Sequence, residues 1–127
     1  MTLPRTTGDL ASGALSAQGG PHPRDPSAAQ VDAAVVSFAM LADPTRVRML
    51  WAMASQELDV ASLAAAAGCR PTVASQHLAK LRLAGLVDGT RDGRRIVYRL
   101  RGGHVRNLLR EAMFHADHQI TGEPVHD

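Results

Sequence analysis

The sequence predicts a mainly α-helical fold with a small β-hairpin, arranged as a winged helix-turn-helix. Two short helices are expected over residues 60–67 and 72–84, with a tight turn between them. A hairpin is expected directly afterwards, because Asp92-Gly93 joins two stretches, 87–91 and 95–100, and the second alternates in the manner of a strand. A hairpin that follows the second helix of such a pair is its wing.

The turn between the two helices has a local cause at each of its ends. Asp59 stands where a helix N-cap belongs, since its carboxylate can accept the open N–H groups of the first turn. Gly68 follows the last residue of the first helix, where a left-handed backbone costs glycine least. Pro71 falls in the first turn of the second helix, where a missing N–H does no harm.

Two further helices are expected before this motif and one after it. The first covers residues 27–41, where an apolar stripe recurs at helical spacing: Val31, Ala34, Val35, Phe38 and Leu41. Asp43 and Pro44 start the second. We assign four of its residues to the core: Val47, Leu50, Trp51 and Ala54. Its Arg46 and Arg48 are expected to face outward near the DNA backbone or to pair with acids. The last helix runs from about His104 to His118 or Ile120, after Gly102-Gly103.

These elements predict one winged helix-turn-helix domain over residues 27–120. Residues 1–26 are rich in Gly, Pro, Ser, Thr and Ala without apolar periodicity, which predicts a disordered arm. Residues 121–127 contain Gly122 and Pro124 and are expected to form a flexible tail. The chain has 3% aromatic residues, so its modest core must come from Ala, Leu, Val and Met and would gain from dimerisation.

The positive charge of the chain is concentrated in residues 70–110. The net charge is +2, but residues 70–110 carry ten Lys or Arg against two Asp, while both flanking parts are acidic. A basic centre of this kind indicates a polyanionic partner. A lone cysteine, Cys69, excludes an intramolecular disulfide. No apolar run reaches the length of a membrane span, and no secretory signal is present, so we expect a cytoplasmic protein.

The polar face of the 72–84 helix is the candidate surface for reading DNA. Thr72, Ser75 and Gln76 project from its first turns, and glutamine can pair bidentately with adenine. A second group of basic residues is suited to phosphate or minor-groove contact: Arg70, Lys80, Arg82, Arg91, Arg94 and Arg95. In a dimer the two helices would lie about one DNA turn, roughly 34–36 Å, apart.

The last helix contains three histidines that are candidate metal ligands. His104 and His115 are 11 residues apart, close to three full turns, and His118 lies one turn beyond His115. On a straight helix His104 and His115 are about 16 Å apart, too far to share one metal ion. An antiparallel partner helix would bring His104 of one chain to His115 and His118 of the other. The spacing therefore predicts two equivalent metal sites in a homodimer.

The chain resembles the ArsR/SmtB family of metal-responsive repressors. The resemblance is carried by MLADPTRVRMLWAM, SQHLAKLRLAGLV and RDGRRIVYRL, followed by a helix opening HVRNLL and closing FHADH. It covers residues 38–118. It implies an apo dimer that binds operator DNA through Thr72, Ser75 and Gln76 and pairs through its first and last helices. It also implies that His77 packs partly against the wing.

Within this family, the end of the chain looks most like the actinobacterial nickel/cobalt sensors. That likeness implies ligands at His104, at Asp117-His118 and at the tail pair His126-Asp127, for Ni(II) or Co(II), with Zn(II) as the alternative. The family often has Asp two residues before the first histidine, where this chain has Gly102. Asp117 points away from the face of His104 unless the helix has begun to unwind. His22 is a further candidate ligand in the arm.

Two other readings of the chain stay open. In one, the DNA-binding module answers to a non-metal effector and its histidines are structural. In the other, the chain binds or carries metal without binding DNA, which predicts no salt-dependent duplex binding. An enzyme is not expected, since we find neither a nucleophile–base pairing nor a glycine-rich phosphate loop.

Overall fold

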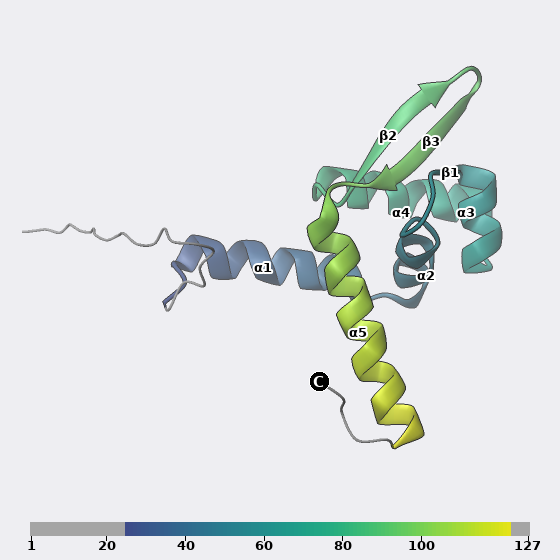
Figure 1. The fold of residues 1–127 in the computed structure, drawn as a ribbon. Coiled ribbons are helices and arrows are strands. Elements are labelled where there is room, and N and C mark those ends of the chain that lie inside the picture. Colours follow the sequence, from purple (N-terminus) through teal and green to yellow (C-terminus); the bar gives the residue numbers. More distant parts are fainter. Residues whose placement is uncertain (1–24, 123–127) are drawn as a thin grey trace, which may run out of the picture. The chain divides into compact units, whose positions relative to one another are not determined.

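The computed structural model describes residues 25–122 and contains five helices and three short strands within that range (Figure 1). The chain divides into two compact units between Ala33 and Ala34, inside the first helix. In chain order the elements are α1 (Ala28–Leu41), α2 (Pro44–Ala52), β1 (Leu58–Asp59), α3 (Val60–Ala67), α4 (Pro71–Leu83), β2 (Val87–Asp92), β3 (Arg95–Leu100) and α5 (Gly103–Thr121). The mainly helical winged helix-turn-helix predicted from the sequence is confirmed.

The helix-turn-helix, α3 and α4, forms by the predicted local chemistry. The Asp59 carboxylate accepts the backbone N–H of Ser62 at 2.9 Å and caps α3. Gly68 ends α3 with a φ of 69°, in the left-handed region that glycine adopts at least cost. Pro71 opens α4 at its first position. Gly68 and Pro71 therefore fix the two ends of the turn between α3 and α4.

The wing is part of a three-stranded antiparallel sheet in the order β1-β3-β2. The hairpin pairs Val87 with Leu100 at its base and Asp92 with Arg95 at its tip. The two-residue turn is thus Gly93-Arg94, one position later than expected. The sequence analysis missed β1, which pairs Leu58 with Tyr98 of β3 and leads directly into α3. A strand of two residues has no periodicity to detect.

The core lies between α2, α3, α4, the base of the wing and the start of α5. Its buried side chains are almost all aliphatic or methionine, as the composition requires: Met49, Leu50, Met53, Leu63, Ala64, Ala67, Ala74, Leu78, Leu81, Leu86, Val87, Tyr98, Leu100, Val105 and Leu109. Close packing of this kind holds α4 on α3 and fixes which face of α4 remains outside.

Trp51, which was assigned to the core, and the apolar stripe of α1 are exposed in the single chain. Trp51 is 47% exposed, whereas Leu50 beside it is fully buried, so the assignment of Trp51 to the core is wrong. No residue of α1 is buried, and Val35 and Phe38 are both more than half exposed. Helical spacing identifies an apolar stripe but does not tell whether the same chain covers it. Among residues 25–122, no helix is long and apolar enough to cross a membrane.

Candidate functional site

The outer face of α4 presents the three predicted base-reading residues together. Thr72, Ser75 and Gln76 are all exposed. The opposite face of the helix is fully buried through Ala74, Leu78 and Leu81, and this burial prevents the helix from turning its polar side inward. Arg70, which occupies the N-cap position of α4, and Lys80 are also exposed.

The three arginines at the tip of the wing are exposed but differ in what they contact. Arg95 donates to Asp59 at 3.0 Å and to Asp92 at 3.2 Å, and both pairs raise the pKa of its guanidinium. Arg91 donates a long 3.4 Å hydrogen bond to the carbonyl of Gly93. Arg94 has no hydrogen bond or ion pair to any residue in 25–122. Of the three, Arg95 is therefore paired with acids, whereas Arg91 and Arg94 form no ion pair with any residue in 25–122.

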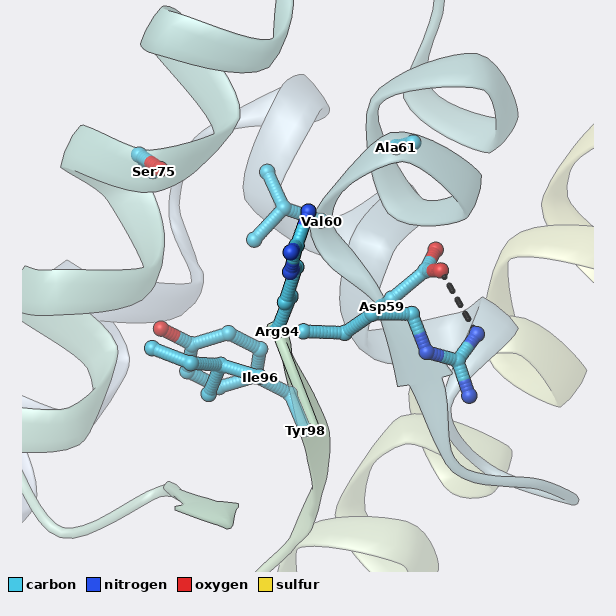
Figure 2. Close-up of a pocket in the computed structure, with 8 residues that line it drawn as sticks. Asp59, Val60, Ala61, Ser75, Arg94, Ile96 and Tyr98 are labelled. Atoms are coloured by element: carbon cyan, nitrogen blue, oxygen red, sulfur yellow. Dashed lines mark hydrogen bonds and ion pairs between the residues drawn. The ribbon is translucent and has the colours of Figure 1, made fainter. Parts of the chain in front are cut away.

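A cleft of about 330 Å³ separates the wing from the helix-turn-helix (Figure 2). Its lining comes from the end of β1, the start of α3, α4 and β3: Asp59, Val60, Ala61, Ser75, Arg94, Arg95, Ile96 and Tyr98. In Figure 2 the Arg94 side chain lies between the helix that carries Ser75 and the helix that carries Ala61. The cleft thus opens between the two elements that the sequence assigns to DNA contact.

Asp59 is the acidic member of this cleft. Its side chain is 20% exposed and forms the ion pair with Arg95 that the dashed line in Figure 2 marks. The Ser62 backbone N–H, then the Ser62 side chain and then Arg95, hold the pKa of this carboxyl below its ordinary value of 3.8. Asp59 is therefore an ionised carboxylate at neutral pH within this cleft.

A second ion pair closes the base of the wing. Arg101 donates to the Asp88 carboxylate through both Nε, at 3.0 Å, and Nη2, at 2.7 Å. The Arg101 hydrogen bonds lower the pKa of Asp88. Both acids within the basic centre, Asp88 and Asp92, are therefore paired with arginines of the wing.

Arg46 lies where the sequence analysis did not expect it. Its guanidinium is half-buried and donates to the carbonyl of Met40 at 2.6 Å and to that of Ala39 at 3.3 Å. It also lies 3.2 Å from Nδ1 of His77 on α4. The expectation that Arg46 faces outward or pairs with an acid is wrong, whereas the partial packing of His77 against the wing stays a prediction. No periodic pattern in the sequence marks such a contact between α2 and α4.

Arg106 is another structural residue that sequence reasoning missed. Its Nε donates to the carbonyl of Ala54 at 2.7 Å and holds the start of α5 against the end of α2. The N-terminal part of α5 is packed further through the buried side chains of Val105 and Leu109. From there α5 runs away from the wing and the helix-turn-helix (Figure 1).

The three histidines of α5 lie in one uninterrupted helix. His104 is in its first turn and exposed, His115 is exposed, and His118 is half-buried, with its ring centroid 6.2 Å from that of Phe114. Within the described part of a single chain, no three His, Cys, Asp or Glu side chains are placed to hold one metal ion.

The structure gives a reason for the missing aspartate before His104. Gly102 has a φ of 75° and a ψ of 177°, a conformation that is essentially restricted to glycine. An aspartate at this position would therefore strain the backbone where β3 leads into α5.

The other predicted ligands are less well placed or lie outside the described residues. Asp117 lies within a helix that continues to Thr121, so the unwinding that would turn it toward His104 does not occur there. It lines an apolar surface hollow with Trp51, Met113 and Phe114 instead. His22, His126 and Asp127 lie outside residues 25–122.

Comparison with known proteins agrees with this architecture. Residues 43–88 match the family model described as bacterial regulatory protein, arsR family. The chain is 47% identical to the transcriptional regulator KmtR of Mycobacterium tuberculosis over 88% of this chain and 85% of that protein. It is 40% identical to the transcriptional regulator NmtR of the same organism, over 83% of this chain and 88% of that protein.

The fold of a solved structure matches as well. The homodimeric winged helix-turn-helix DNA-binding domain of Mb0332 from Mycobacterium bovis, determined by NMR, superposes with a TM-score of 0.71 at 31% identity. The match covers 87% of this chain and all of that one. The matched relatives are transcriptional regulators and not enzymes. This chain therefore belongs to the arsR family of bacterial regulatory proteins.

Proposed function

We propose that the chain is a homodimeric repressor that binds operator DNA without metal and is released when Ni(II) or Co(II) binds between paired C-terminal helices. The observation that carries the proposal is the geometry of α5. Its histidines share one face, yet His104 and His115 are about 16 Å apart. His104 can therefore join His115 and His118 at one metal ion only when a second copy of the helix is present.

The DNA-binding part of the proposal rests on the outer face of α4 and on the wing. Thr72, Ser75 and Gln76 would reach base edges in the major groove, while Arg70 and Lys80 would hold phosphates. Arg91, Arg94 and Arg95 of the wing would lie over the neighbouring backbone or minor groove. Two protomers would present their α4 helices roughly 34–36 Å apart, which favours an imperfect palindrome as the operator.

Dimerisation is supported by apolar surface on the first and last helices. On α5, Phe114 is 64% and Ile120 is 85% exposed, and α1 adds Val35 and Phe38. Exposed apolar side chains in such number are typical of an interface. The related Mb0332 domain is a homodimer. In this proposal, residues 27–120 would bind DNA and dimerise, and residues 121–127 would supply additional metal ligands.

The metal in this proposal is an effector that the protein senses. In an antiparallel pair, His104 of one chain would meet His115 and His118 of the other, joined by His126 and then by Asp117 or Asp127. Nitrogen and oxygen ligands in a set larger than four suit Ni(II) and Co(II), whereas Zn(II) prefers four. Metal must bind the DNA-incompetent form more tightly, by the factor with which DNA weakens metal binding.

The test is fluorescence anisotropy of a labelled duplex from the promoter upstream of the gene, titrated with apo protein and then with metal. We expect apo binding, and release by Ni(II) or Co(II) at a lower free concentration than by Zn(II). His104→Ala should abolish release of the duplex by metal while leaving duplex binding by the apo protein intact. Gln119→Ala changes an exposed residue on the same helix and should leave both properties unchanged.

The outcomes separate the proposal from its alternatives. Release by Zn(II) at the lowest concentration would indicate a zinc-responsive repressor. Tight apo binding that no metal disturbs would indicate a non-metal effector and structural histidines. A chain that binds metal but not duplex would be a metal-binding protein without a regulatory function.

A further inference from the structure

The cleft between the wing and α4 lies on the path that a DNA strand must take, if the proposed DNA binding is correct. When α4 occupies the major groove and the wing tip reaches the adjacent minor groove, one sugar-phosphate strand separates the two grooves. That strand must cross the space between α4 and the wing. Ser75 lines this space from α4 and Arg94 lines it from the turn of the hairpin (Figure 2).

The cleft also contains a charge that opposes a phosphate. Asp59 lines it, and its pKa is held below the ordinary value by the Ser62 hydrogen bonds and by Arg95, so the carboxylate is ionised at neutral pH. The same carboxylate caps α3 through the Ser62 N–H at 2.9 Å. Its position at the start of α3 therefore places a negative charge next to the expected path of the DNA backbone.

The two arginines that line the cleft differ in their ionic partners. The guanidinium of Arg95 forms ion pairs with Asp59, at 3.0 Å, and with Asp92, at 3.2 Å. Arg94, its neighbour in sequence, contacts no acid among the described residues and lines the same cleft. One cation is thus committed to protein carboxylates, while the other is available.

We infer that Arg95 serves DNA binding by neutralising Asp59, so that a backbone phosphate can lie in the cleft between Ser75 and Arg94, and that Arg94 is the wing arginine that holds this phosphate. Arg95 is in this sense a positioning residue for the DNA backbone. The inference rests on the proposed function only in requiring that the chain bind duplex DNA.

The test is a cycle of variants at Asp59 and Arg95, with affinity for a short duplex of arbitrary sequence measured over a range of salt concentrations without metal. Arg95→Ala exposes the Asp59 charge and is expected to weaken binding roughly three- to tenfold. Asp59→Asn in the same chain should restore most of this loss. Asp59→Asn alone should bind more tightly than the wild type, because it removes a negative charge next to the backbone and leaves Arg95 paired with Asp92 only.

Arg94→Ala is the matched comparison within the same turn. It should weaken binding and reduce the slope of log K against log salt by about 1, the value for one lost phosphate contact. Asp59→Asn should improve the binding of Arg94→Ala only by the factor by which it improves the wild type, and it should not restore the lost salt slope. This contrast distinguishes the two arginines even though they are adjacent and equally charged.

The result that would overturn the inference is a double variant, Asp59→Asn/Arg95→Ala, that binds as weakly as Arg95→Ala alone, since Arg95 would then hold a phosphate itself. Asparagine is nearly as good an N-cap as aspartate, so α3 should remain capped, and a thermal melt of each variant verifies this. Because the test uses no operator and no metal, failure of metal release leaves it intact. A wild-type chain without salt-dependent duplex binding would overturn both proposals.

Discussion

Arg46 and His77 connect the start of α2 to the middle of α4 by a 3.2 Å contact between a guanidinium Nη1 and an imidazole Nδ1. Because arginine can only donate, Nδ1 accepts and the ring proton lies on Nε2. The same guanidinium donates to the carbonyls of Ala39 and Met40, the closing residues of α1. One side chain therefore joins the ends of two helices to the helix that carries the candidate DNA-reading residues.

Replacement of Arg46 should destabilise the fold without removing any DNA contact. Arg46→Ala leaves the Met40 carbonyl and the His77 nitrogen without a donor, which is expected to cost about 1–3 kcal/mol in the free energy of unfolding. Urea denaturation measures this loss. Arg48→Ala, an exposed neighbour two positions on, is the control and should have little effect; equal losses in both variants would contradict the structural role of Arg46.

Gly89 is required by the ring packed across from it in the wing. A Cβ at this position would lie 2.9 Å from Cε1 of Tyr98, its partner in the β2–β3 register, and the ring is buried. Gly89→Ala should therefore lower stability by about 1–3 kcal/mol, as overpacking does, and reduce the melting temperature.

The companion change that tests this cause is Tyr98→Leu. If the tyrosine ring is the obstacle, the two changes together should cost less than the sum of their separate costs. Strict additivity would show that the ring is not what Gly89 accommodates.

An aspartate at position 102 should not complete a metal site. Because Gly102 has a φ of 75° and a ψ of 177°, Gly102→Asp is expected to cost about 1–3 kcal/mol in backbone strain. Ni(II) affinity, followed by calorimetry, should not rise. Gly103→Ala, in helical backbone one residue further on, is the control and should be neutral or slightly stabilising. Tighter Ni(II) binding by Gly102→Asp would show that the turn can rearrange around a metal.

The stability of the fold should fall in acid. The pKa values of Asp43, Asp59 and Asp88 are all lowered from 3.8, mainly by backbone hydrogen bonds at the first two and by Arg101 at the third. A depressed folded-state pKa contributes stability above the unfolded-state pKa, and this stability is lost as pH falls through the folded-state value. The melting temperature should therefore be nearly constant from about pH 7 to pH 5 and decline below about pH 4. Asp88→Asn should flatten the decline; an unchanged curve would exclude Asp88 as a contributor.

The exposed apolar face of α5 should control association. Phe114→Glu places a charge on a side chain that is 64% exposed in the single chain, so the fold should be retained while the dimer dissociates. Sedimentation velocity should show a monomer, with loss of tight operator binding. Leu83→Glu, at an 88% exposed position at the end of α4, should leave the dimer intact. A Phe114→Glu variant that remains dimeric would place the interface elsewhere.

Local chemistry explains which parts of the fold were predictable. Asp59, Gly68 and Pro71 each act within one turn of the chain, so the helix-turn-helix could be recognised from their order. The wing followed from alternation and one turn dipeptide. Trp51 was assigned to the core because it lies at helical spacing from other apolar residues, but such spacing does not show whether the same chain covers that side of the helix.

Contacts between distant parts of the sequence were not predictable in this way. The ion pair of Asp59 with Arg95 spans 36 positions and the contact of Arg46 with His77 spans 31. Neither leaves a periodic or compositional trace. The predicted metal ligands His104, His115, His118, His126 and Asp127 stay predictions, since helix geometry argues only that His104 and His115 of one chain do not share an ion.

The short strand β1 has a mechanical consequence. It ends at Asp59 and α3 begins at Val60, so the sheet that carries the wing is joined to the helix-turn-helix without an intervening hinge. A hairpin held at its base, at β1 and by the Asp59–Arg95 pair is expected to move together with α3 and α4 as one unit. In a dimer, we therefore expect an effector that acts at α5 to alter the distance and angle between two such units.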